Sequence, residues 1–248
     1  MMGAKRIAAE PRAAQARTSA FAQYKALLAK DLRQEIRTKE MITSMALYAL
    51  LVLIVYGAAL GASAGGFDIV QVSGGLLWAM IVFTSLLGLG RSFAREKESN
   101  CLEGILLAPV DRGAIYLAKA TANLVFLAIV EVIAIPIFWF LFMTSAPVSP
   151  DAWSIVVPIV LGTIGISGIG TLLSTITANT RGKDVLLAVL FIPIAFPLLY
   201  ACASATTAVI VGADAWMDSL RIGAAIAGGY DVIMTLVSWV LYDYVVSA

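Results

Sequence analysis

The run ATANLVFLAIVEVIAIPIFWFLFM, residues 120–143, decides the fold class of this chain. It is 24 residues long and holds a single charged side chain, Glu131. At about 1.5 Å per helical residue, such a run crosses a hydrocarbon layer about 30 Å thick. Backbone inside lipid must satisfy its own hydrogen bonds, and a run this long does so as a helix. The run therefore predicts a membrane-spanning helix.

Five similar runs lie around it. Residues 41–60, 74–90, 154–178 and 185–211 carry no charge, and residues 224–242 carry one, Asp231. The composition agrees, because 60% of the 248 residues are hydrophobic and only 13% are charged, unlike a soluble domain. We expect an all-α membrane protein with six transmembrane helices, forming one transmembrane domain over residues 19–248.

The basic residues predict the orientation. Sixteen of the 17 Lys and Arg residues precede the first run, or lie between the second and third or the fourth and fifth, and only Arg221 lies on the other side. The positive-inside rule places those segments and both termini on the cytoplasmic side of the membrane. The net charge of +1 gives no reason to expect a nucleic-acid partner.

The N-terminal part divides into two pieces. Residues 1–18 read as a disordered cytoplasmic tail, although an organelle targeting segment has a similar composition. Residues 21–36 predict an amphipathic helix that lies at the membrane interface against lipid. The alternative is a solvent-exposed start of the first span. The apolar positions recur at three- and four-residue steps: Phe21, Tyr24, Leu28, Leu32 and Ile36.

The loop over residues 91–119 carries its own helix signals. Asn100 and Glu103 form a capping pair, and Pro109 ends the helix after about two turns. Asp111 then caps the helix that continues into the third run. The short helix has an apolar stripe, and charged residues flank it: Leu102, Ile105 and Leu106, with Arg95, Glu96, Lys97, Glu98 and Arg112. The pattern fits a contact for a soluble motor protein, with the charges setting its register, and it fits a solvated loop equally.

Two blocks of sequence resemble a known family. The first is the stretch from Trp78 to Lys119, which contains LLGLGRSFAREKE, LEGILLAPVDR and AIYLAK. The second is LGTIGISGIGTLLSTITANTRGKDVLL over residues 161–187. Both are similar to the CcmB family, the permease subunits of haem exporters in bacterial cytochrome c maturation, within the wider ABC-2 family of export permeases. With the six-run layout, the resemblance covers nearly all of residues 21–246.

The resemblance implies an ATP-driven haem export or delivery complex needed for c-type cytochromes. Its coupling helix, residues 100–108 here, would dock on a separate CcmA-like ATPase, beside CcmC-like and CcmD-like membrane subunits and a CcmE-like haem chaperone. Haem is then the candidate cargo, or ATP releases a haem-loaded carrier. The residues carried over to coupling are Arg95, Glu96, Glu98, Leu102, Glu103, Ile105, Leu106, Pro109, Asp111 and Arg112, with Arg181, Lys183 and Asp184 in the second cytoplasmic loop.

The residue types agree with a transporter subunit that is not itself an enzyme. The Gly-Lys pair at Gly182 and Lys183 is followed by Asp184 and lacks the glycine spacing of a phosphate-binding loop, so ATP is expected on the partner. There is no histidine, which argues against a metal site, haem ligation or a Ser-His protease around Ser167. Cys101 and Cys202 read as free thiols. The alternative function is a general ABC-2 exporter of lipid, polysaccharide or drug.

Two acids lie within the predicted spans. Glu131 falls near the bilayer midplane, where a carboxylate must be paired, wet or protonated. It would line a pathway or a subunit contact, or be a protonated acid hydrogen-bonded to a neighbouring helix. Asp231 is expected near the outer end of the sixth span, snorkelling or in a break before the span begins. The fourth span carries small and hydroxyl residues every four positions, which favours close helix packing: Thr163, Ser167, Thr171 and Thr175, with Gly170, Ser174 and Ala178.

Overall fold

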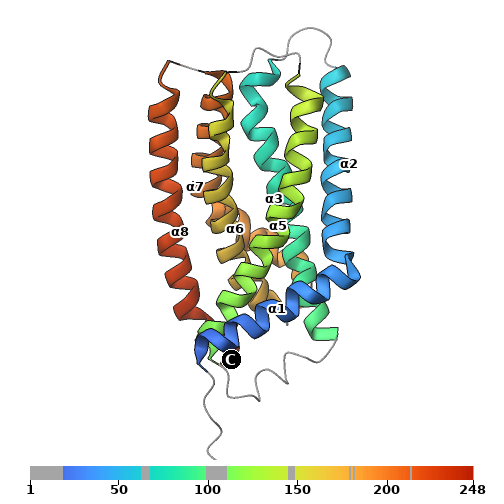
Figure 1. The fold of residues 1–248 in the computed structure, drawn as a ribbon, viewed down its shortest axis with the longest axis vertical. Helices are drawn as coiled ribbons and strands as arrows, with labels where there is room; N and C mark the ends of the chain where they lie inside the picture. The colour runs from blue at the N-terminus through green and yellow to red at the C-terminus, as the bar shows by residue number, and fades with distance from the viewer. Residues whose placement is uncertain are drawn as a thin grey trace, which may run out of the picture.

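A computed structural model describes residues 19–62, 68–98, 111–144, 149–178, 180, 182–212 and 214–247 (Figure 1). All regular structure in these ranges is helical. The elements are α1 (Ala20–Thr38), α2 (Glu40–Ala62), α3 (Ile69–Glu98), α5 (Arg112–Phe142), the short 3-10 helix η1 (Ala152–Ile155), α6 (Val156–Thr177), α7 (Lys183–Val211) and α8 (Trp216–Ser247).

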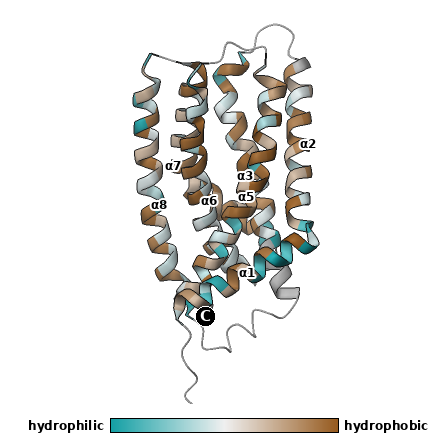
Figure 2. Cartoon of the chain, viewed as in Figure 1, coloured by the Kyte–Doolittle hydropathy of each residue, from teal (hydrophilic) through white to brown (hydrophobic). Residues whose placement is uncertain are grey.

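Six of these helices are long and apolar enough to cross a membrane: α2, α3, α5, α6 with η1, α7 and α8. This confirms the predicted fold class of a six-helix membrane protein. Figure 1 shows the six side by side, with α1 lying across one end of the bundle, which we call the α1 end. Figure 2 shows hydrophilic residues gathered on α1 and at the helix ends beside it.

The predicted loop over residues 91–119 is shorter than expected. Helix α3 continues to Glu98, beyond the end of its span-like part at Arg91. On the other side, α5 begins at Arg112 and is capped by the Asp111 side chain, which accepts a hydrogen bond from Gly113 N at 2.9 Å, as the sequence predicted. Residues 91–98 and 112–119 are therefore helical extensions, because charged helix formers continue a helix outside lipid as readily as apolar ones. The predicted coupling helix itself, residues 100–108, lies outside the described residues.

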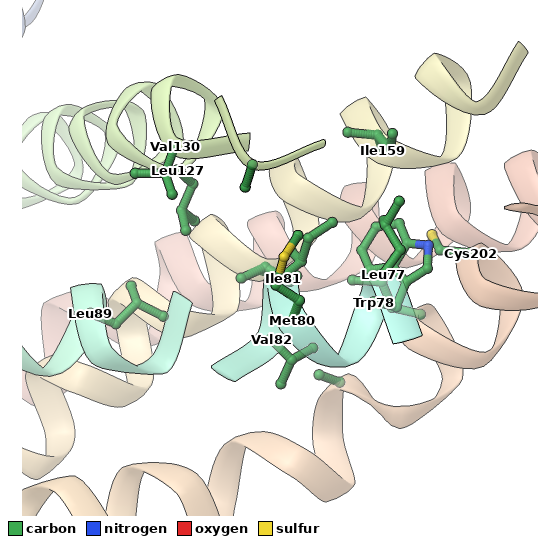
Figure 3. Packing of buried hydrophobic residues seen from close by; sticks show 14 of the residues in the cluster. Leu77, Trp78, Met80, Ile81, Val82, Leu89, Leu127, Val130, Ile159 and Cys202 are labelled. Carbon is green, nitrogen blue, oxygen red and sulfur yellow. The ribbon is translucent and has the colours of Figure 1, made fainter. Parts of the chain in front are cut away.

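Helix α6 is the most deeply buried of the six span-like helices, and α8 is the least. Neighbours approach α6 closely because of its glycines: a Cβ at Gly162 would collide with the Trp78 ring, and one at Gly170 with Leu89. Figure 3 shows Leu77 and Trp78 of α3 between Ile159 of α6 and Cys202 of α7. The Trp78 indole also donates to Thr206 Oγ1 at 3.0 Å, so α3 is held against both helices.

The hydroxyl groups of α6 are mostly satisfied within the helix. Thr163, Thr171 and Thr175 donate to the carbonyl oxygens four residues earlier, at 2.7, 2.6 and 2.8 Å. Ser167 donates to the Ile164 carbonyl oxygen at 2.9 Å. Such bonds remove the cost of burying a hydroxyl in an apolar environment. The hydroxyl row of the fourth span is thus compatible with tight packing, as the sequence suggested.

Candidate functional site

A buried ion pair fastens α1 to the beginning of α5. Lys119 Nζ lies 2.8 Å from Asp31 Oδ2, and the two side chains are only 6% and 11% exposed. Lys30 Nζ also approaches Asp31, at 3.3 Å, but it is far more exposed. A buried pair holds its geometry firmly, since losing either partner leaves an uncompensated charge. Asp31 and Lys119 therefore fix α1 across the bundle.

Two further hydrogen bonds join the beginning of α1 to residues on either side of Lys119. Gln23 Oε1 accepts from Asp111 N at 3.0 Å, and the Tyr24 hydroxyl donates to Thr121 Oγ1 at 3.3 Å. Asp111 is one of the residues predicted for coupling and lies three residues after the predicted coupling helix, residues 100–108. We call these three contacts together, between α1 and residues 111–121, the α1–α5 junction. It ties α1 to the part of the chain that follows the predicted coupling helix.

The other end of α1 is joined to α2. Glu35 is only 2% exposed, and its Oε1 accepts from the backbone N–H groups of Met41 and Ile42 at 2.8 and 2.9 Å. These are free donors at the start of α2, so Glu35 acts as a cap across the turn. At the turn, Lys39 has the left-handed conformation, with φ of 54°. Movement of α1 must therefore be transmitted to α2.

The apolar stripe of α1 does not form one uniform face. Leu28 and Leu32 pack against the core, whereas Phe21 and Ile36 are exposed. The residues of α1 that face the bundle lie at positions 23–24, 27–28, 31–32 and 35. This face includes Asp31 and Glu35 as well as leucines. The amphipathic helix is present, but part of the stripe expected to face lipid is used to pack against the protein. Its placement in the headgroup layer stays a prediction.

The second predicted loop also meets the end of α3. Asp184, in the first turn of α7, lies so close to α3 that a Cβ at Gly90 would be 2.8 Å from Asp184 Oδ1. Arg91, which follows Gly90 in α3, donates from Nη1 to Ser44 Oγ of α2 at 2.7 Å. The structure thus brings Asp184 to the base of the α3 extension. Lys183 is the first residue of α7, and Arg181 lies outside the described residues.

Within the bundle, Glu131 of α5 faces Thr163 of α6. The Thr163 hydroxyl lies 2.8 and 2.9 Å from the two Glu131 oxygens and 2.7 Å from the Ile159 carbonyl oxygen. A hydroxyl has one proton to donate. A neutral Glu131 satisfies all three oxygen atoms best, because its own O–H donates to the Thr163 hydroxyl while that hydroxyl donates to the Ile159 carbonyl oxygen. This geometry favours the protonated, hydrogen-bonded alternative for Glu131.

Asp231 lies elsewhere than the sequence interpretation placed it. Helix α8 begins at Trp216, not near residue 224, so Asp231 falls at its centre and is only 7% exposed. Neither of its carboxylate oxygens has a hydrogen-bond partner in the part of the chain that the structure describes. The expected snorkelling or helix break is wrong. The sequence interpretation placed the start of the sixth span after Asp218 and Arg221 because both are charged. In the structure they are exposed residues inside the first turns of α8.

A family model describing the CcmB protein matches residues 22–238, from the first turn of α1 to the last part of α8. The chain belongs to the CcmB protein family. Three curated relatives carry the name Heme exporter protein B. That of Rhodobacter capsulatus is 30% identical over 176 residues, which are 71% of this chain and 78% of the relative. That of Paracoccus denitrificans is 29% identical over 190 residues (77% and 85%), and that of Pseudomonas aeruginosa 25% over 200 residues (78% and 87%).

The residues carried over from the CcmB resemblance fall into three groups. Arg95, Glu96 and Glu98 lie on the extension of α3, and Asp111 and Arg112 begin α5. Lys183 and Asp184 begin α7. The remaining members lie outside the described residues: Leu102, Glu103, Ile105, Leu106, Pro109 and Arg181. Their role in coupling stays a prediction.

Sequence reasoning missed the buried charges that hold α1 of this CcmB family member against α5 and α2. Lys119 entered only as one positive charge in the orientation count, and Asp31 and Glu35 did not enter at all. One signal was available: acids at positions 31 and 35 fall on one face of a helix that was expected to be basic and apolar. Among the described residues, no cluster of His, Cys, Asp and Glu could hold a metal ion.

Proposed function

We propose that this chain is the permease subunit of an ATP-driven haem export or delivery complex that serves c-type cytochrome formation. Membership of the CcmB family and the names of its relatives support this function. The chain would lie in the bacterial inner membrane with the α1 end and both termini in the cytoplasm, as the basic residues favour. Haem is the cargo: either haem itself crosses, or ATP energy releases a haem-loaded carrier at the periplasmic face.

The observation that best supports coupling is the α1–α5 junction. A motor that pushes on residues 99–110 moves the end of α3 and the beginning of α5. Asp111 and Lys119 then carry α1 with them through Gln23 and Asp31, and Glu35 passes the movement to α2. The partner is a CcmA-like ATPase that binds ATP, assembled with CcmC-like and CcmD-like subunits and a CcmE-like chaperone. Charged residues around the segment set the register of docking.

Aspartate at Leu102 or Leu106 tests the docking segment. An apolar side chain buried at a protein contact loses its favourable transfer free energy when it is replaced by a charge. Leu102→Asp and Leu106→Asp should therefore reduce co-purification of the ATPase and formation of c-type cytochromes, with unchanged abundance in the membrane. Gly104→Asp, which adds a charge on the opposite face of the predicted helix from the apolar stripe, serves as the control. Wild-type ATPase retention and cytochrome levels in both leucine variants would refute the coupling role.

Reporter fusions test the orientation. Fusions after Ala64, Asp151 and Asp214 should report the periplasm, and fusions after Asn100, Gly182 and Ala248 the cytoplasm. The reason is that sixteen of the 17 basic residues lie on one side of the six runs. Alkaline phosphatase and green fluorescent protein fusions give opposite signals on the two sides. A reversed signal at any one site contradicts the six-span topology.

A further inference from the structure

The inner face of α8 carries a carboxyl group that the proposed coupling mechanism does not use. Asp231 is the sixteenth of the 32 residues of α8, so it lies at half its length. It is only 7% exposed, and neither carboxylate oxygen has a hydrogen-bond partner among the described residues. A polar group buried in this way is unfavourable unless something neutralises or solvates it.

Three elements surround Asp231. From α6, Gly165 faces it so closely that an added Cβ would collide with Asp231 Oδ1. From α7, the Leu198 side chain also lies beside the place where a Cβ of Gly165 would be. The Cys202 thiol of α7 is an electrostatic neighbour of Asp231. The adjacent Tyr230 of α8 donates its hydroxyl to the Ile194 carbonyl oxygen. None of these groups is a cation, and no ion pair to Asp231 occurs within the described ranges.

Glu131, the other acid inside the bundle, does not share this site. It faces Thr163, whereas Asp231 faces Gly165. Residues two apart on a helix point about 200° apart, so the two acids lie on opposite sides of α6. A divalent metal ion needs several oxygen ligands, which a single carboxyl cannot supply. One proton, in contrast, neutralises one carboxylate.

Polar residues of α8 lie between Asp231 and the α1 end. On the inner face of α8 they follow at one-turn steps: Thr235, Ser238 and Tyr242. Thr235 Oγ1 and the Tyr116 hydroxyl of α5 both lie 3.5 Å from where a Cβ of Gly168 would be. Ser238 is fully buried and faces the Tyr116 hydroxyl, and its own hydroxyl makes no hydrogen bond of good geometry to any residue that the structure describes. These hydroxyl groups can hold water between α5, α6 and α8.

Toward the other end, the same face of α8 is closed. Ala227 is fully buried, and Gly223 packs so tightly on α7 that an added Cβ would be 2.7 Å from Ala205 Cβ and 2.9 Å from the Ala201 carbonyl oxygen. Leu220 is also buried. Water has polar partners along α8 on only one side of Asp231. Figure 1 shows that this is the side on which α8 reaches the α1 end.

We propose that Asp231 is a proton-binding site at the centre of the bundle, and that the polar face of α8 admits the proton from the α1 end. One proton passes from water to a carboxylate oxygen, with no change of oxidation state. The neutral acid fits the closed contact between α6 and α8, and an ionised Asp231 requires that contact to open to water. The proposed proton site does not depend on the proposed haem cargo. The two tests below therefore measure the protonation of Asp231 and the access of water to α8, and they do not measure export.

Carbodiimide labelling tests the protonation. Membranes containing the full chain are treated at about pH 7.5 with dicyclohexylcarbodiimide, which reacts with neutral carboxyl groups in apolar surroundings. Peptide mass spectrometry should find at least about tenfold more modification at Asp231 than at Asp218, because an ordinary aspartate is ionised at this pH. Asp218 lies on the same helix and is 73% exposed, so a water-soluble carbodiimide should reverse the preference. Asp231→Asn should remove the label, and Glu131→Gln should leave it. Equal labelling of the two aspartates, or none at Asp231, overturns the proposal.

Cysteine accessibility tests the route. Single cysteines replace Ser238 or the lipid-facing Val237 in a chain without Cys101 and Cys202. A membrane-impermeant methanethiosulfonate added from the α1 end should modify Ser238→Cys about tenfold faster than Val237→Cys. The reason is that the reacting thiolate forms only in contact with water. Val237 is the matched control, since it is the preceding residue and points out of the bundle. Equal rates at the two positions overturn the route.

Discussion

Asp31→Asn is expected to destabilise the protein by about 3–5 kcal/mol, the cost of removing one partner of a buried ion pair. The side chains of Asp31 and Lys119 are 11% and 6% exposed and 2.8 Å apart, so solvent screens the remaining charge of Lys119 poorly. The loss should appear as a lower thermal midpoint of the detergent-solubilised protein and a lower abundance in membranes. Because α1 would detach from α5, export activity should fall with it.

Two controls separate this effect from a general loss of charge. Asp218→Asn removes the partner of Arg221, but that pair is 3.9 Å apart and its side chains are 73% and 74% exposed, so no measurable change is expected. The double variant Asp31→Asn with Lys119→Met removes both charges and should recover at least half of the lost stability. If Asp31→Asn is as stable as Asp218→Asn, the α1–α5 junction does not hold α1 in place.

Gly74→Ala should be the most damaging conservative change in the core. A Cβ at this position of α3 would be 2.5 Å from the Ala203 carbonyl oxygen and 2.8 Å from Thr207 N. These are backbone atoms of α7, which cannot rotate away as a side chain can. Separating the two helices would open the contact around Trp78, so a cost of about 3 kcal/mol or more is expected, at the upper end for overpacking.

Gly75→Ala provides the matched comparison, because among the described residues no atom outside its own stretch of α3 lies within 4 Å of where a Cβ would be. Replacing this helical glycine by alanine should be neutral or slightly stabilising, since alanine has the higher helix propensity. Thermal midpoints of the two purified variants check the difference. Equal midpoints would show that α3 and α7 are not packed backbone to backbone at residue 74.

The sequence predicted the number of spans well, and the reason is physical. Lipid requires long apolar helices, so each span is recorded in a single run of sequence. Local signals also worked where a neighbouring residue supplies the partner, as with the Asp111 cap of α5. The same reasoning placed the end of the second span at residue 90 but took the helical residues 91–98 for a loop, because charge marks the end of lipid and not the end of a helix.

Contacts between distant parts of the chain could not be predicted. Asp31 and Lys119 are far apart in the sequence, and nothing in either segment specifies the other. The depth of Asp231 depended on where α8 begins, and the exposed Asp218 and Arg221 hid that start. The close approaches at Gly74 and Gly165 depend on which helices pack together, and that order is a property of the whole bundle.

The internal hydrogen bonds of α6 have a consequence for biogenesis. Helices α7 and α8, which cover much of α6 in the finished bundle, are synthesised after it. The nascent α6 must therefore enter lipid while its Thr and Ser side chains still lack those neighbours. Since Thr163, Thr171 and Thr175 each bond a carbonyl oxygen of their own helix, insertion exposes no lone hydroxyl donor at these positions to the acyl chains. Helix α6 is therefore stable in the bilayer before α7 and α8 have been inserted.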